Sequence, residues 1–195
     1  MRTRSKWRDT GRAHSLSENA TALAYVCWRI ALARARNLHA EDFDYENDRQ
    51  RTSVIAEYLC FFVHIADRIV HGSLGDDDRA TFVSTLAGDV ARHYQRNLED
   101  VFGRGRDYRG GFIELMNERI AEYSGYRFED GSPGFQMLRG LGRNIQDVMG
   151  ESQTNRWIID HVMELDAPAA VQELNKAMDD LFGTANVAAH DAPPK

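Results

Sequence analysis

Residues 54–71 read VIAEYLCFFVHIADRIVH, and the spacing of their apolar residues indicates a helix. At about 100° per residue, its large apolar side chains fill a helical arc of roughly 200°. The polar side chains fall in the opposite arc, as in an amphipathic helix and unlike a strand with alternating faces. We therefore predict a helix from about Tyr45 to His71 that ends at Gly72. It would be roughly 40 Å long and would form the spine of the molecule.

The rest of the chain has the same helical periodicity. We expect the first helix to be central, because apolar side chains cover most of its circumference. Cap residues and glycine stops mark the helix ends. The expected starts are at Ser15 or Ser17, Asp76, Ser132-Pro133, Thr154 and Asp166, and the expected stops include Gly150 and Gly183. The fold prediction is an all-α, single-domain bundle of about six or seven helices with a long second helix. The further helices are expected at about 17–38, 77–101, 112–126, 133–149, 157–165 and 167–182.

The net charge of −6 hides two parts of opposite sign. Residues 1–15 hold five basic side chains and one acidic one, a net charge of +4, whereas the remainder holds 19 basic and 29 acidic groups, a net charge of −10. We predict a flexible basic arm over residues 1–15, the helical domain over 16–183 and a disordered tail over 184–195. An acidic body argues against a protein that coats nucleic acid with its whole surface.

The number of Cys, the lengths of the apolar runs and the share of Arg indicate where in the cell, and in what kind of organism, the protein is found. Two Cys cannot build a disulfide framework, and no run reaches the roughly 18 apolar residues of a membrane span. The N-terminus also lacks the short apolar run of a secretory signal. We therefore expect a cytoplasmic protein with reduced thiols. Arg supplies 21 of the 24 basic residues, a bias typical of GC-rich bacterial genomes.

The polar arc of the second helix contains residue types that bind metals. Glu57, His64 and Asp67 are the metal candidates there, and His161 from a later helix is a fourth. We favour a solvated or surface-paired face, because Arg68 within the same arc opposes a cation. A site completed by a second helix remains the alternative. Glu114, Glu118 and Glu122 form a ladder that could add carboxylates, but we interpret it as a solvated acidic stripe.

Two polar residues fall inside apolar arcs. His161 lies in an apolar arc, and we interpret it as a satisfied core residue, with a functional role left open. The apolar residues of that arc are Trp157, Ile158, Val162 and Leu165. Arg119 lies within the apolar arc of the fourth helix. Because an unpaired buried charge is costly, we expect Arg119 to pair with a carboxylate across the helix packing.

Several catalytic patterns are absent from the sequence. It has no Glu-x-x-His pair for a di-iron bundle, no His-Glu-x-x-His, no Gly-Lys-Ser/Thr phosphate loop and no Gly-x-Ser-x-Gly. The His-Asp pair around which a metal phosphohydrolase is built occurs only at His190-Asp191 in the tail. Gly140 and Gly142 are interpreted as sites of close helix packing. Basic residues mixed with aromatics remain candidates for contact with an anion or a nucleic acid: Arg2, Arg4, Lys6, Arg8, Arg104, Arg106 and Arg109.

These patterns favour a non-catalytic, bacterial-type helical protein that acts through protein contacts, with a homodimer as one form of them. This interpretation requires no cofactor, although the sequence does not identify any ligand. The alternative is a metal- or small-ligand-binding helical enzyme that uses the His64 and Asp67 face. A third hypothesis is association with nucleic acid through the basic arm, which is not favoured beside an acidic body.

Overall fold

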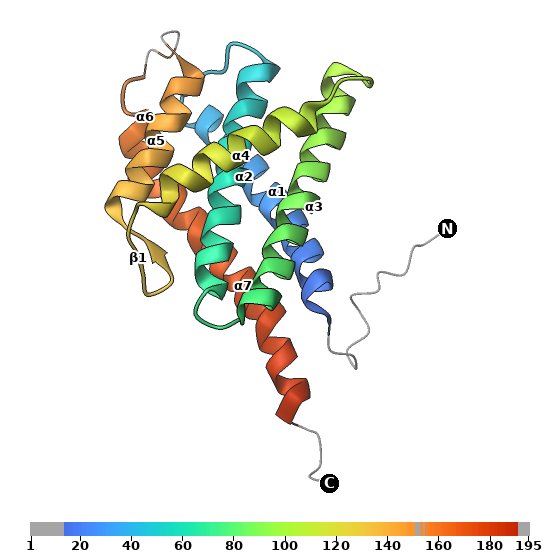
Figure 1. Cartoon of the computed structure of the whole chain (residues 1–195). Coiled ribbons are helices and arrows are strands. Elements are labelled where there is room, and N and C mark those ends of the chain that lie inside the picture. Colours follow the sequence, from blue (N-terminus) through green and yellow to red (C-terminus); the bar gives the residue numbers. More distant parts are fainter. Residues whose placement is uncertain (1–13, 151–152, 154, 191–195) are drawn as a thin grey trace.

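The computed structural model describes residues 14–150, 153 and 155–190. Over these residues the chain is an all-α bundle, as predicted, with one short hairpin (Figure 1). Residues 1–13 of the predicted arm, the predicted cap Thr154 and residues 191–195 lie outside the described residues. The elements are α1 Leu16–Ala40, α2 Asp48–Val70, α3 Asp76–Phe102, α4 Tyr108–Ser124, β1 Phe128–Glu129, β2 Ser132–Pro133, α5 Phe135–Met149, α6 Ile158–His161, the π-helix η2 Val162–Asp166 and α7 Ala167–His190.

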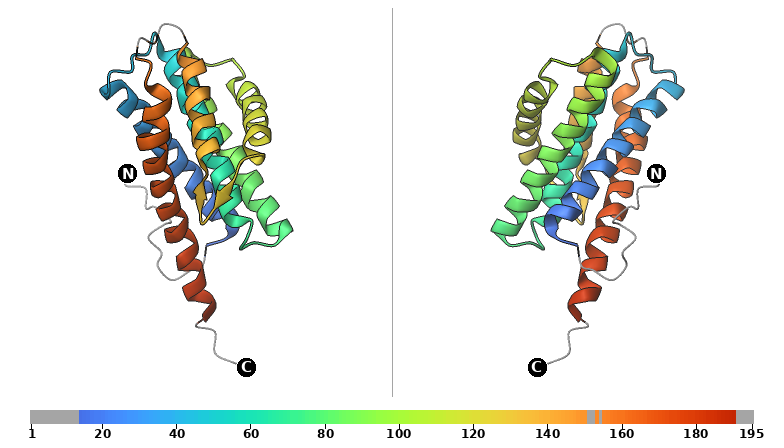
Figure 2. Two further views of the ribbon diagram at one scale, coloured as in Figure 1. Left: turned by 90° about the vertical axis from the view of Figure 1, so that its left-hand side faces the viewer. Right: turned by 90° about the vertical axis from the view of Figure 1, so that its right-hand side faces the viewer.

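The second helix is central but not the longest. α2 has 23 residues, whereas α1 has 25 and α3 has 27, so the second helix is long, as predicted, but it is not the longest. α2 contacts α1, α3, α4, α5 and α7, which makes it the middle of the bundle in place of α1. The two side views show α1 and α7 on one side of α2 and α4 on the other (Figure 2). Because α2 is covered from both sides, polar residues on it must find partners within the protein.

The predicted helix ends are correct at some positions and wrong at others. Ser15 caps α1, and Glu18 completes the capping box by accepting from the Ser15 backbone N–H. α5 ends at Gly150 as expected. α3 begins after Gly75, with no side-chain cap from Asp76. α7 continues past Gly183 to His190, so the predicted stop is wrong and residues 184–190 of the predicted disordered tail have a helical backbone.

The hairpin before α5 is the clearest structural feature that the helical prediction missed. Phe128 pairs with Pro133 and Glu129 with Ser132 across a two-residue turn. Asp130 and Gly131 both have positive φ, of 51° and 71°, as the common two-residue hairpin turn requires. Asp-Gly is a strong hairpin signal, and it outweighs Ser132-Pro133 as a helix start. Gly134 takes the N-terminal cap position of α5 instead.

Two glycines of α5 allow close helix packing, as predicted. A Cβ at Gly142 would lie 3.1 Å from the Ile159 carbonyl oxygen and 3.2 Å from the Ile159 Cα of α6. A Cβ at Gly140 would lie 3.1 Å from the Tyr126 ring. α5 therefore approaches α6 closely because Gly142 has no side chain.

A glycine pair provides a test of this packing. We expect Gly142→Ala to lower the free energy of unfolding by about 1–3 kcal/mol, because the backbone of α6 cannot move away cheaply. Gly88→Ala is the matched control on α3, where an added Cβ meets no atom within 4 Å. That change should raise stability by up to about 1 kcal/mol through helix propensity. Urea denaturation measures both, and equal effects at the two positions would contradict the packing described here.

Candidate functional site

The polar face predicted on α2 is not solvated over most of its length. Every residue from Val54 to Ala66 is buried, including Glu57, Cys60 and His64. The prediction of a solvated face is therefore wrong for these residues. α4 and α5 cover the side of the helix that the helical-wheel projection placed in water. Only the last turn fits the prediction, with Asp67 and Arg68 half-buried and His71 exposed.

Glu57 is held by a two-pronged ion pair with Arg119 of α4. The Nε and Nη2 atoms of Arg119 donate to the two carboxylate oxygens of Glu57 at 2.7 and 2.8 Å. The Glu57 side chain is 2% exposed and that of Arg119 is 21% exposed. The pairing of Arg119 across the helix packing is thus confirmed. Hydrogen bonding to Glu57 raises the pKa of Arg119, so the guanidinium of Arg119 stays charged.

A polar network continues from Arg119 toward α5. The Nη1 atom of Arg119 lies 3.7 Å from a Glu122 oxygen. Asn144 of α5 donates from Nδ2 to Glu122 at 3.0 Å and to the Tyr123 hydroxyl at 3.3 Å. Burial raises the pKa of Tyr123 well above its ordinary value, so its hydroxyl stays protonated. The network joins α2, α4 and α5 through satisfied hydrogen bonds.

His64 lies beside this network without joining it. The residue is 3% exposed, and neither ring nitrogen has a hydrogen-bond partner among the described residues. Its ring centroid is 5.7 Å from that of Tyr123. Burial, with a contribution from Arg68, lowers the pKa of His64 to about 4, and Asp67 opposes this only in part. His64 is therefore a neutral core residue at neutral pH, which makes the fold sensitive to acid.

The four metal candidates are not brought together. Arg79 binds Asp67 with two hydrogen bonds of 2.7 and 2.8 Å, and Arg119 occupies both oxygens of Glu57. His161 lies on α6, half-buried, with its ring centroid 5.1 Å from that of Phe43. Within residues 14–150, 153 and 155–190, no three His, Cys, Asp or Glu residues are arranged to hold a metal ion.

The Glu ladder of α4 divides into two environments. Glu114 and Glu118 are exposed, as the solvated-stripe interpretation expected. Glu122 is different, because its side chain is 25% exposed and accepts hydrogen bonds from Asn144 and Tyr126. It belongs to the polar network and not to a stripe.

A pocket lies beneath α4, between this helix and its neighbours. Its volume is about 490 Å³, within the range of small-molecule sites. α2, α3, α4 and the end of α5 supply its walls. Apolar and aromatic side chains dominate, with the Glu57–Arg119 pair as the main polar feature. The lining residues are Ser53, Ala56, Glu57, Tyr94, Leu98, Asp107, Tyr108, Gly111, Phe112, Leu115, Arg119 and Val148.

The rings in this pocket are fixed by their own contacts. Tyr94 and Phe112 stack with centroids 4.6 Å apart and planes inclined by 24°. The Tyr108 hydroxyl donates to the Gly103 carbonyl at 3.2 Å. Asp107 caps α4 by accepting from the Gly110 N–H at 2.8 Å. The pocket therefore has a rigid aromatic wall at the start of α4 and the ion pair further along the same helix.

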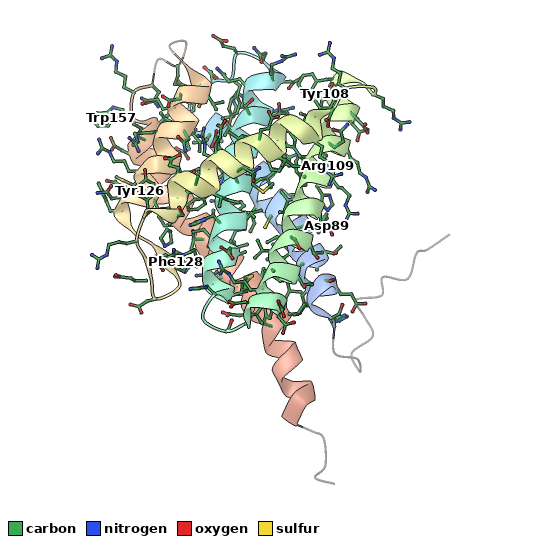
Figure 3. The ribbon with its side chains drawn as sticks, viewed as in Figure 1. Asp89, Tyr108, Arg109, Tyr126, Phe128 and Trp157 are labelled. Atoms are coloured by element: carbon green, nitrogen blue, oxygen red, sulfur yellow. The ribbon has the colours of Figure 1, made fainter. Side chains whose placement is uncertain are left out.

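A second hollow, the Trp157 groove, lies where α6 and η2 meet the loop after α1. Its volume is about 350 Å³, and it shares no lining residue with the pocket. Figure 3 places Trp157 and Tyr108 at opposite sides of the molecule. The groove is lined by Glu41, Phe43, Asn155, Trp157, Asp160, His161, Glu164 and Leu165.

The basic candidates fall into two groups. Arg104, Arg106 and Arg109 are exposed around the loop between α3 and α4. Arg2, Arg4, Lys6 and Arg8 lie outside the described residues. No helix of the described chain is long and apolar enough to cross a membrane.

Comparison with models of protein families, with curated proteins and with solved structures finds no significant match to this chain.

Sequence reasoning missed a buried polar cluster around Asp166. Asp166 was expected to cap the last helix, but it lies inside the continuous run of η2 and α7 and is 4% exposed. It accepts from the Tyr58 hydroxyl at 2.9 Å and lies 3.5 Å from Arg34. Burial raises the pKa of Asp166. No motif signals this cluster, because its members come from α1, α2 and η2.

Proposed function

We propose that this chain is a helical binding protein whose ligand site is the pocket beneath α4. The observation that carries the proposal is an open, mostly apolar pocket with a pre-formed ion pair in its wall. Binding is favoured over chemistry because Glu57 and Arg119 hold each other. Neither is placed as a free base or a free electrophile.

The lining favours an uncharged ligand with a flat apolar body. Tyr94, Phe112 and Leu115 offer apolar area, and the charges of Glu57 and Arg119 offset each other. An anion would lose its hydration without gaining a free cation from the lining, and the Asp107 carboxylate lies at the exposed start of α4 and accepts from the Gly110 N–H. Arg119 has five N–H donors, and Glu57 takes two of them. The donors left over suit a carbonyl oxygen on the ligand.

Three small probes of one shape test this assignment. Benzamide carries a carbonyl and no charge, whereas benzoate and benzamidinium replace that group by an anion and a cation. We expect benzamide to bind about tenfold more tightly than either charged probe, as measured by ligand-observed NMR titration. Equal or tighter binding of benzoate would contradict the uncharged ligand class.

A glycine substitution links this binding to the pocket. Gly111 lines the pocket, and a Cβ there meets no atom within 4 Å. We expect Gly111→Leu to fill this space and to weaken benzamide binding by about tenfold. Gly88→Leu is the matched control, since Gly88 is equally open but lies outside the pocket lining. Unchanged binding in Gly111→Leu would contradict the site.

Action through protein contacts, with a homodimer as one form, is the second candidate function. The exposed Trp157 and Leu165 favour it, because large apolar side chains on a surface are typical of interfaces. A cytoplasmic location and a bacterial source are part of the same proposal. Association with nucleic acid through the basic arm and Arg104, Arg106 and Arg109 remains a third candidate.

A further inference from the structure

The Trp157 groove is an apolar hollow with an acidic edge. Trp157 is 72% exposed and Leu165 is 62% exposed, while Phe43 beneath them is 2% exposed. Glu41, Asp160 and Glu164 are exposed on its edge, and the described residues that line it include no Arg or Lys. A partner for this groove needs apolar side chains together with positive charge.

The π-helix explains why Leu165 is exposed. The sequence placed Leu165 in one apolar arc with Val162. In a π-helix the turn is wider than in an α-helix, so the position that returns to the core is shifted along the chain. Val162 and Asp166 are buried, whereas Glu164 and Leu165 face outward into the groove. Tyr58 and Arg34 hold Asp166 inward, which fixes this turn.

The chain contains one segment with the complementary character. Residues 1–12 hold Arg2, Arg4, Lys6, Arg8 and Arg12 against Asp9 alone, with Trp7 among them. We propose that the Trp157 groove takes the basic segment 1–12 of a second copy of this chain. Trp7 packs against Trp157 and Leu165, and the neighbouring basic side chains pair with the acidic edge. This inference is independent of the ligand proposed for the pocket beneath α4.

Chain length assigns the segment to a second copy. α1 has 25 residues and is about 37 Å long, and Glu41 of the groove follows its C-terminal end. The segment joins the other end of α1 at Ser15. The eight Cα-to-Cα steps from Trp7 to Ser15 span at most about 29 Å when fully extended. The backbone of Trp7 therefore stops short of the far end of α1 in its own chain, which favours the groove of a second copy.

Because the chain has few lysines, a cross-linking experiment can test whether the basic segment lies in the groove of another copy. Lys occurs only at Lys6, Lys176 and Lys195. A carbodiimide joins a lysine amine directly to a carboxylate, and a mixture of ¹⁴N- and ¹⁵N-labelled full-length chains shows which cross-links join two copies. We expect Lys6 of one copy to cross-link to Glu41, Asp160 or Glu164 of the other at low ionic strength. The yield should fall as added salt screens the charges.

Charge variants of the full chain complete the test. We expect Asp160→Lys/Glu164→Lys, and separately Arg4→Glu/Arg8→Glu, to weaken self-association about tenfold in sedimentation velocity, and the two pairs combined to restore it. Arg104→Glu/Arg106→Glu changes the net charge by as much as the arm variant but lies on another loop, and should have no effect. Trp157→Ser should weaken association without altering the far-ultraviolet circular dichroism.

Four outcomes would overturn the proposal: a monomer at all concentrations tested, Lys6 cross-links confined to one copy, no effect of the arm variants, or an equal effect of the Arg104/Arg106 control. Groove variants that act when arm variants do not would mean that another occupant covers the groove. Loss of benzamide binding bears only on the pocket, so the two proposals fail separately.

Discussion

Arg119→Met is expected to lower the free energy of unfolding by about 3–5 kcal/mol. The substitution leaves the carboxylate of Glu57 buried, at 2% exposure, without its two charge-assisted hydrogen bonds. Methionine keeps much of the apolar stem of arginine, so the loss reports the charge and not a cavity. Urea denaturation followed by circular dichroism measures the change.

Two further variants separate the ion pair from general damage. Glu57→Met/Arg119→Met removes both charges and should return stability close to that of the parent chain. Arg79→Met breaks the pair with Asp67, whose geometry is equally close but whose side chain is 20% exposed. That loss should stay within about 1 kcal/mol. Equal losses for Arg79→Met and Arg119→Met would contradict the account of burial.

Acidification is expected to remove about 3 kcal/mol of stability through His64. Burial lowers the pKa of this histidine in the folded protein to about 4, below the value of about 6.5 for an exposed histidine. The unfolded chain therefore binds the proton first. The contribution of His64 is constant above about pH 6.5, declines as pH falls toward 4, and is lost below that.

Comparison with a chain that lacks this group isolates the effect from other titrations. We expect His64→Leu to lose the part of the acid dependence between pH 6.5 and 4, and to be at least as stable as the parent at pH 5, because two unpartnered ring nitrogens leave the core. His71→Leu is the control, since His71 is exposed on the same helix. Urea midpoints across this pH range measure all three chains. An unchanged pH profile in His64→Leu would show that His64 is not the sensor.

Local signals in the sequence predicted much of the fold correctly. Helical periodicity gave the all-α class, and Ser15 with Glu18 marked the start of α1 correctly. The errors lie where a local signal competes with packing or with a turn. Asp130-Gly131 forms a hairpin, and the π-helix absorbs Asp166 into a continuous helix although aspartate favours a cap. Neither the hairpin nor the π-helix can be predicted from the helical-wheel projection of a single helix.

The candidate site was predicted only in part. An arginine in an apolar arc implied a carboxylate partner, and Glu57 meets that expectation. A wheel reports which residues share a face but not what covers that face. It therefore assigned Glu57, Cys60 and His64 to water, whereas α4 and α5 bury them. The pocket needs four helices to form, so no spacing within one segment could indicate it.

Methyl NMR tests most directly whether the pocket beneath α4 binds an uncharged small molecule. Four methyl-bearing residues line it and can be observed by ¹³C methyl NMR in the full chain: Ala56, Leu98, Leu115 and Val148. Titration with benzamide should shift these methyl signals saturably, with little change at Leu165 of the Trp157 groove. Shifts confined to Leu165 or to methyls away from the pocket, or no saturable shift at the four lining residues, would contradict the claim.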